Sequence, residues 1–197
     1  MINLCVIPAR GGSRRIPRKN IRSFHGKPII AYSIEAAKAS NLFRYIVVST
    51  DDDEIAAIAK QYGAWVFMRP ERLAQDEVGT REVTIEVLNQ VMHETSSHID
   101  YVCCLYATAP LLSVHDLIAG YLQCTGRMVH AISVGYPPLQ DAAQFYWSHA
   151  VALPSVEYFG EDTSLVHIPS HRVCDINVEN DWLKVEQMYA ELHKEEA

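Results

Sequence analysis

The chain has 197 residues, of which 49% are hydrophobic, enough to form the core of one domain with no compositional break that would indicate a second. It carries 17 Lys and Arg against 24 Asp and Glu, and a net charge of -7 argues against a nucleic-acid-binding surface. No apolar stretch has the length of a membrane span and no signal-peptide pattern opens the chain, so we expect a cytoplasmic protein without a membrane partner. Five cysteines without C-x-x-C spacing are expected to be reduced core thiols.

Strand-like and helix-like segments alternate in the first half of the chain. Apolar runs at 2–8, 45–50 and 64–68 predict short buried strands. Apolar residues at helical spacing predict helices over 28–40 and 53–63, the second ended by Gly63. This β-α-β-α order is typical of a parallel sheet.

The second half continues the alternation. Helices are predicted over 79–94, from an N-cap at Ser113 through 122, and over 178–193, and strands over 100–107 and 130–134. The stretch that contains QFYW (144–147) is less regular. Together these segments predict an α/β protein with a doubly wound, mostly parallel sheet, helices on both faces and a ligand crevice at the strand ends.

A basic loop follows the first strand, and it carries Arg10, Arg14, Arg15, Arg18 and Lys19 around two adjacent glycines. Glycines allow the backbone to approach a phosphate, amide groups in such a turn can bind an anion, and arginine forks match phosphate oxygens. The loop therefore predicts a polyphosphate site. The alternative is a glycine turn with solvated charges. Neither GxxxxGK[ST] nor GxGxxG is present, which argues against kinases and dehydrogenases.

Five motifs occur in a characteristic order and spacing: PARGGSRRIPRKNI (8–21), STDD (49–52), RPERLAQD (69–76), YATAP (106–110) and DINVENDW (175–182). In these motifs the chain resembles the cytidylyltransferases that activate nonulosonic acids, and YATAPLL and DAAQFYW (141–147) are most similar to the pseudaminate branch of that family. The resemblance implies a single-domain, Rossmann-like nucleotide-diphospho-sugar transferase fold over 1–197, a homodimer, and use of CTP and Mg²⁺. It implies a CMP-sugar and pyrophosphate as products.

The resemblance also assigns nucleotide-binding residues. Those expected at the triphosphate are Arg10, Gly11, Gly12, Ser13, Arg14 and Lys19. Those expected at the cytidine moiety are Asn20, Arg69 and Thr80, which could instead be a turn former, a surface charge and a helix N-cap. STDD is implied to scaffold the site, or it could simply cap the helix that follows it. Because the leaving pyrophosphate develops charge, Arg10, Arg14 and Lys19 are also predicted to be catalytic.

The metal motif departs from the family pattern. Asp175 is implied to be a catalytic residue and the Mg²⁺ ligand, since a hard cation prefers carboxylate oxygen. The family usually has Asp-Ile-Asp, whereas Asn177 stands in the third position here. Asn177 could cap the last helix as well as aspartate would. We therefore expect weaker or differently arranged metal binding at Asp175 and Asn177.

The sugar region also departs from the family pattern. Relatives have a longer excursion, which helps to form a homodimer and covers the sugar, whereas VGYPP (134–138) runs almost directly into LQDAAQFYW here. The segment near 135–160 is thus shortened, either by natural trimming or by the loss of a segment, and Ala143 replaces a usual glycine. By resemblance, the candidate sugar contacts are Thr108, Asp141, Gln144, Phe145 and Tyr146. The alternative is that this aromatic run belongs to the core.

The implied reaction is attack by the anomeric hydroxyl of an acidic nine-carbon sugar, foremost pseudaminate, on the α-phosphorus of CTP. Alternatives within the family are neuraminate, legionaminate or an octulosonate as the sugar, although octulosonate enzymes usually lack the GGS loop. A non-catalytic CTP-binding protein is the alternative of another class, because Asn177 removes a charge from the metal motif.

Overall fold

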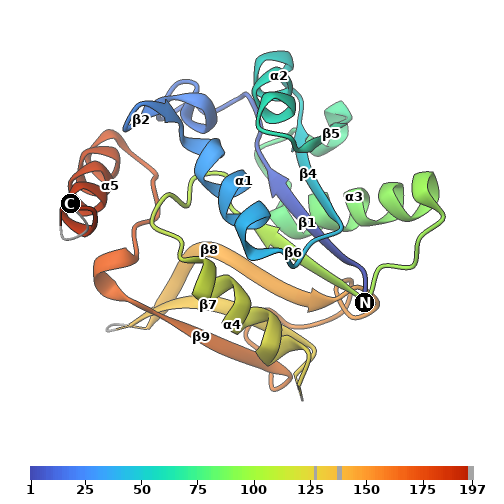
Figure 1. Ribbon diagram of the computed structural model, residues 1–197. Coiled ribbons are helices and arrows are strands. Elements are labelled where there is room, and N and C mark those ends of the chain that lie inside the picture. The colour runs from blue at the N-terminus through green and yellow to red at the C-terminus, as the bar shows by residue number, and fades with distance from the viewer. Residues whose placement is uncertain (127, 137–138, 195–197) are drawn as a thin grey trace.

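The computed structural model describes residues 1–126, 128–136 and 139–194. Its main feature is a seven-stranded sheet in the order β5-β4-β1-β6-β8-β7-β9 (Figure 1). The strands are β1 (Asn3–Pro8), β4 (Tyr45–Thr50), β5 (Trp65–Met68), β6 (Tyr101–Leu105), β7 (His130–Tyr136), β8 (Gln140–His149) and β9 (Thr163–Pro169). Only β8 runs antiparallel to its neighbours, so the sheet is mostly parallel, as predicted.

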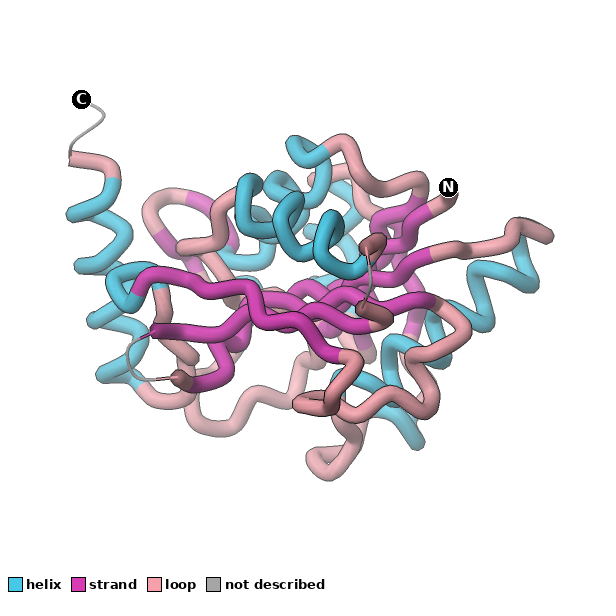
Figure 2. The backbone as a smooth tube through the Cα atoms, turned by 90° about the horizontal axis from the view of Figure 1, so that it is seen from below, coloured by secondary structure: helices cyan, strands magenta, loops and turns pink. Residues whose placement is uncertain are grey.

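Helices cover both faces of the sheet, and Figure 2 shows the strands running between them. The helices α1 (Ile29–Ser40), α2 (Asp53–Gln61) and α4 (Val114–Cys124) pack on one face, and α3 (Thr80–Thr95) packs on the other. Alternation along β1 explains the two layers: Cys5 and Ile7 face the first set, while Leu4 and Val6 face α3. All four side chains are fully buried, which is typical of a central parallel strand.

A third apolar cluster joins the C-terminal helix to the segment after the basic loop. The helix α5 (Glu179–Leu192) packs Trp182 against Phe24, which lies in a short hairpin of β2 (Ser23–Phe24) and β3 (Lys27–Pro28). The two rings meet edge to face with centroids 5.7 Å apart. This contact fixes the segment before α5, and with it Asp175, beside the loop after β1.

Two parts of the fold differ from the prediction. The irregular stretch around QFYW is the ten-residue strand β8, and β9 was not predicted. The N-caps of α3 and α5 are Gly79 and Val178, so the alternative roles of Thr80 and Asn177 as helix caps were wrong. The N-cap at Ser113 is confirmed, because its hydroxyl accepts a hydrogen bond from the His115 amide.

The prediction of unpaired thiols agrees with the structure. All five cysteines are free, and four of them are buried. Within the described residues no helix is both long and apolar enough to cross a membrane.

Candidate active site

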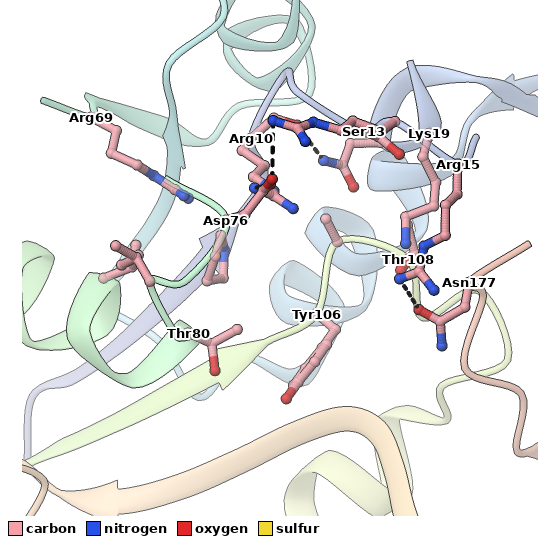
Figure 3. A pocket seen from close by; sticks show the side chains of 16 residues that line it. Arg10, Ser13, Arg15, Lys19, Arg69, Asp76, Thr80, Tyr106, Thr108 and Asn177 are labelled. Atoms are coloured by element: carbon pink, nitrogen blue, oxygen red, sulfur yellow. Dashed lines mark hydrogen bonds and ion pairs between the residues drawn. The ribbon is translucent and has the colours of Figure 1, made fainter. Parts of the chain in front are cut away.

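A cavity of about 500 Å³ lies at the carboxyl ends of β1, β5 and β6, the edge at which the sequence predicted a ligand (Figure 3). Its wall is formed by the basic loop after β1, the segment from Arg69 to α3, residues 106–108 after β6, and Asn177 before α5. Parallel strands bring these segments together because their carboxyl ends share one edge of the sheet.

The STDD motif holds the basic loop in place. The Asp51 carboxylate accepts a hydrogen bond of 2.8 Å from the Gly11 amide. Asp52 caps α2 by accepting from the amides of Glu54 and Ile55, and it forms an ion pair with Arg18. That pair and the cap amides hold the pKa of the Asp52 carboxyl below its usual value. Both interpretations of STDD, scaffold and helix cap, therefore apply.

A glycine is required at residue 11 because the Asp52 side chain lies so close to the loop. A Cβ at residue 11 would lie 2.7 Å from Oδ2 of Asp52 and 2.9 Å from its Cβ. Asn20 fixes the other side of the loop, since its buried side chain donates a 2.9 Å hydrogen bond to the Arg10 carbonyl. The conformation of the loop thus depends on side chains from the turn between β4 and α2 and from the turn η1 (Lys19–Ile21).

The side chains of Arg10 and Arg14 converge on Asp76. Arg10 donates to one oxygen of that carboxylate, and Arg14 lies 3.2 Å from the other. The hydrogen bond from Arg10 and the charges of both arginines keep the pKa of Asp76 below its usual value. Together with Ser13, the two arginines form a basic wall suited to an anion such as a phosphate.

Lys19 lies deeper in the cavity. Its ammonium donates a 2.6 Å hydrogen bond to the Ile176 carbonyl, so it links the basic loop to the segment before α5. Burial lowers the pKa of this amine, and the attraction of Asp175 acts in the opposite direction. A fixed, desolvated cation of this kind stabilises developing negative charge more strongly than one in water.

The opposite end of the cavity contains Arg69 and Thr80. Arg69 is 8% exposed, and its guanidinium donates to the carbonyls of Ser49 and Leu73 at 2.9 and 3.3 Å. The alternative that Arg69 is a surface charge was therefore wrong. Thr80, the first residue of α3, and Tyr106, which follows β6, complete this end (Figure 3).

Asn177 lines the cavity, and Asp175, which does not line it, lies next to Asn177. The Asn177 amide nitrogen donates a 2.6 Å hydrogen bond to Oδ2 of Asp175, and its oxygen accepts one of 3.0 Å from Arg15. Among the residues that the structure describes, no group of three or more histidine, cysteine, aspartate or glutamate side chains could hold a metal. Asp175 is thus a single exposed carboxylate oriented by an amide.

The candidate sugar contacts are spread over the fold. Thr108 lines the cavity, but Gln144, Phe145 and Tyr146 are at most 3% exposed within the central strand β8. Gln144 donates to the Arg172 carbonyl at 2.6 Å, and the Tyr146 hydroxyl lies 3.3 Å from that of Thr84. These three side chains therefore support the site from the core, in agreement with the alternative stated for the aromatic run.

Asp141 also stays outside the cavity wall. It accepts hydrogen bonds from the Ala143 amide at 2.8 Å and from the Tyr158 hydroxyl at 3.1 Å. The sequence prediction placed Arg15 in the basic loop without giving it a role of its own, and it missed Asp76 and Tyr106, although both lie inside a quoted motif. The only sequence signal for these residues was a polar or aromatic side chain just after a strand or beside a glycine turn.

Comparison with known proteins decides the family. The family model described as cytidylyltransferase matches residues 4–155. The chain belongs to the cytidylyltransferase family. It is 36% identical to the pseudaminic acid cytidylyltransferase of Campylobacter jejuni (strain 81-176), over 92% of this chain and 93% of that protein. It is 43% identical to the CMP-N,N'-diacetyllegionaminic acid synthase of C. jejuni (strain NCTC 11168), over 54% of this chain and 46% of that protein.

Solved structures confirm the fold of this family member. A CMP:2-keto-3-deoxy-manno-octonic acid synthetase complexed with CTP superposes with a TM-score of 0.77 at 17% identity, covering 98% of this chain and 100% of that one. A 4-diphosphocytidyl-2C-methyl-D-erythritol synthase has a TM-score of 0.72 at 11% identity, over 95% and 98% of the two chains. The nucleotidyltransferase fold predicted from the sequence is thus confirmed.

Proposed function

We propose that this cytidylyltransferase transfers CMP from CTP to the anomeric hydroxyl of a nonulosonic acid, foremost pseudaminic acid, and releases pyrophosphate. The observation that carries the proposal is one cavity in which the basic loop after β1 meets Asn177, the residue whose side chain contacts Asp175. The similarity to the pseudaminic acid cytidylyltransferase over 92% of this chain supports that sugar. The enzyme would act in the cytoplasm as a homodimer.

In this proposal the basic loop binds the triphosphate. Arg10, Ser13 and Arg14 offer donors along one wall of the cavity, whereas the Gly11 amide is already bonded to the Asp51 carboxylate and holds the loop in place. Lys19 is placed to stabilise charge on the departing pyrophosphate, because its ammonium is already fixed by the Ile176 carbonyl. Asn20, Arg69 and Thr80 would position the cytidine moiety, Asn20 by holding the loop at the Arg10 carbonyl.

Asp175 and the neighbouring Asn177 fit a magnesium ion in part. Mg²⁺ commonly uses one or two protein carboxylates and completes its shell with water and substrate phosphates, so Asp175 would hold it together with the triphosphate. Asn177 would orient Asp175 in this arrangement, since its amide nitrogen faces that carboxylate and its oxygen faces Arg15. When bound, the ion would neutralise phosphate charge and lower the pKa of the attacking hydroxyl.

The nature of the sugar depends on the smaller half of the molecule. The strand β7 ends at Tyr136 and β8 begins at Gln140, a short separation in sequence that supports a shortened excursion at this place. The alignment with the C. jejuni relative spans 217 positions, more than the length of this chain, so that relative has positions without a counterpart here. Pseudaminate, neuraminate and legionaminate therefore all belong in the first assay.

The test is release of pyrophosphate from CTP and Mg²⁺ with each of the three sugars offered separately. We expect release with pseudaminate in preference to the others. Release with neuraminate or legionaminate alone would assign a different nonulosonic acid. CTP that raises the melting temperature without release with any sugar would contradict the catalytic proposal and favour the non-catalytic alternative. Arg44→Gln, at the exposed residue before the amino end of β4 and thus away from the edge that carries the cavity, is the matched control for arginine variants of the loop.

A further inference from the structure

Arg15 occupies the end of the cavity that it shares with Lys19, Thr108 and Asn177, whereas Arg69 and Thr80 line the other end (Figure 3). The triphosphate assignment uses Arg10, Arg14 and Lys19 but leaves Arg15 without a role. Arg10, Arg14 and Arg18 each form an ion pair with a carboxylate. Within the described residues no such ion pair involves Arg15.

The partner of Arg15 is instead a neutral amide. Its Nη2 donates a 3.0 Å hydrogen bond to Oδ1 of Asn177, and Nδ2 of Asn177 donates to Asp175 at 2.6 Å. The order Arg15–Asn177–Asp175 fixes which end of the amide faces which group. An aspartate at 177 would neutralise Arg15 and would place a second negative charge against Asp175. The amide holds the guanidinium in place without forming an ion pair with it. The Asp181 carboxylate, whose charge interacts with that of Arg15, is bonded to the backbone amides of Asn177 and Val178.

The chemistry of a nonulosonic acid requires a cation beside the α-phosphorus of CTP. Its carboxylate is attached to the anomeric carbon, the same carbon that bears the attacking hydroxyl. During attack the carboxylate must therefore lie beside the α-phosphorus and the Asp175 segment. The negative charges of CTP and of the sugar repel each other at this point, so a planar guanidinium with free N–H groups is well suited to bind the carboxylate.

We propose that Arg15 binds the carboxylate of the acidic sugar, and that Asn177 positions Arg15 for this contact. The inference rests on the proposed function and adds a specificity determinant to it. It also explains why asparagine stands where the family usually has aspartate: the neutral amide keeps Arg15 available to the substrate. A sugar without a carboxylate would lose this interaction.

The experiment measures KM for the sugar and for CTP separately, with pseudaminate or whichever nonulosonic acid the wild type accepts. Arg15→Gln should raise KM for the sugar about tenfold or more, the usual effect of losing a charged hydrogen bond, with little change in KM for CTP. Asn177→Asp should raise the same KM, although it adds a carboxylate at the metal motif. Arg44→Gln, an exposed arginine away from the cavity, is the control.

A substrate analogue makes the test specific for the carboxylate. The C1 carboxamide of the sugar should be a poorer substrate than the acid for the wild type. Arg15→Gln should discriminate less between the acid and the amide. The effects of the Arg15→Gln substitution and of the carboxamide should therefore not be additive. Equal losses in both proteins, or an unchanged KM for the sugar in Arg15→Gln, would overturn the inference while the proposed function stands. Absence of turnover by the wild type with every acidic sugar would instead refute the proposed function and this inference with it.

Discussion

The carboxylate of Asp76 forms an ion pair with Arg10, a residue 66 positions earlier in the sequence, and it lies 3.2 Å from Arg14 as well. An internal anion thus occupies the two guanidinium groups that are proposed to bind the triphosphate. CTP and pyrophosphate would have to compete with Asp76 for them. Since the pair is half exposed, this competition should be modest rather than prohibitive.

Replacement of Asp76 by asparagine should therefore tighten binding of the triphosphate. We expect Asp76→Asn to lower the Kd for CTP and for pyrophosphate by about threefold, because Arg10 and Arg14 lose an internal competitor. Isothermal titration at low ionic strength would measure the effect, and added salt should reduce it. Glu77→Gln removes a neighbouring exposed carboxylate as the matched control, and weaker binding in Asp76→Asn would refute the competition.

The adjacent glycines of the loop should respond very differently to alanine. At residue 11 the new Cβ would lie 2.7 Å from Oδ2 of Asp52, so Gly11→Ala must displace the cap of α2. At residue 12 nothing lies within 4 Å. We expect Gly11→Ala to lose about 1–3 kcal/mol of stability and to bind CTP at least tenfold more weakly, with little change for Gly12→Ala. Chemical denaturation and CTP titration measure the two effects, and equal behaviour of the variants would contradict this account.

Much of the sheet and the position of the cavity could be predicted because they depend on local pattern. Continuous apolar runs indicated β1 and β6, and helical spacing indicated α1 and α3. The strand β9 could not be predicted in the same way. It alternates only weakly in burial, and its place in the sheet is fixed by parallel pairing with β7 some thirty positions earlier.

In the candidate site as well, features of local sequence could be predicted, and contacts between distant segments could not. The basic loop was evident from charge and glycine content, and the family resemblance added Asp175. The partners of these residues were not evident, since the pairing of Arg10 with Asp76 and of Arg15 with Asn177 depends on contacts between distant segments. Phe145 and Tyr146 were expected at the sugar, but β8 lies between β6 and β7, so its side chains pack into the core.

A buried histidine should make the stability of the protein depend on pH. His130 is 1% exposed, and neither ring nitrogen has a hydrogen-bond partner within the described structure. Burial, followed by the charge of Arg81, lowers the pKa of His130 to about 4. Tyr146 and Tyr158 also pack against the ring, and they add no opposite charge at neutral pH.

The lowered pKa of His130 determines the direction in which stability changes with pH. The unfolded chain takes up a proton near pH 6.5, whereas the folded chain resists it until about pH 4, so stability falls as the pH drops through this interval. We expect His130 to account for a loss of about 3 kcal/mol over that range. His130→Phe should remove this part of the pH dependence in urea titrations, whereas His115→Phe, at an exposed position of α4, should retain it. An unchanged slope in His130→Phe would show that the ring is not the source.

The two residues of the metal motif should differ in their response to Mg²⁺. Asp175 supplies the carboxylate, while Asn177 contacts that carboxylate through its amide nitrogen. Asp175→Asn should therefore raise the half-saturating Mg²⁺ concentration by about a hundredfold or abolish activity, and Asn177→Ala should raise it by only about tenfold, the range found for residues that orient a ligand.

Binding of Mn²⁺ followed by electron paramagnetic resonance, in the presence of CTP, gives a readout independent of turnover. Asn180→Ala, an exposed neighbour in α5, serves as the control, and chelation by EDTA should abolish activity in all of the proteins. Metal binding that is unaffected in Asp175→Asn would place the ion on the triphosphate alone, whereas equal losses in Asp175→Asn and Asn177→Ala would make Asn177 a direct ligand.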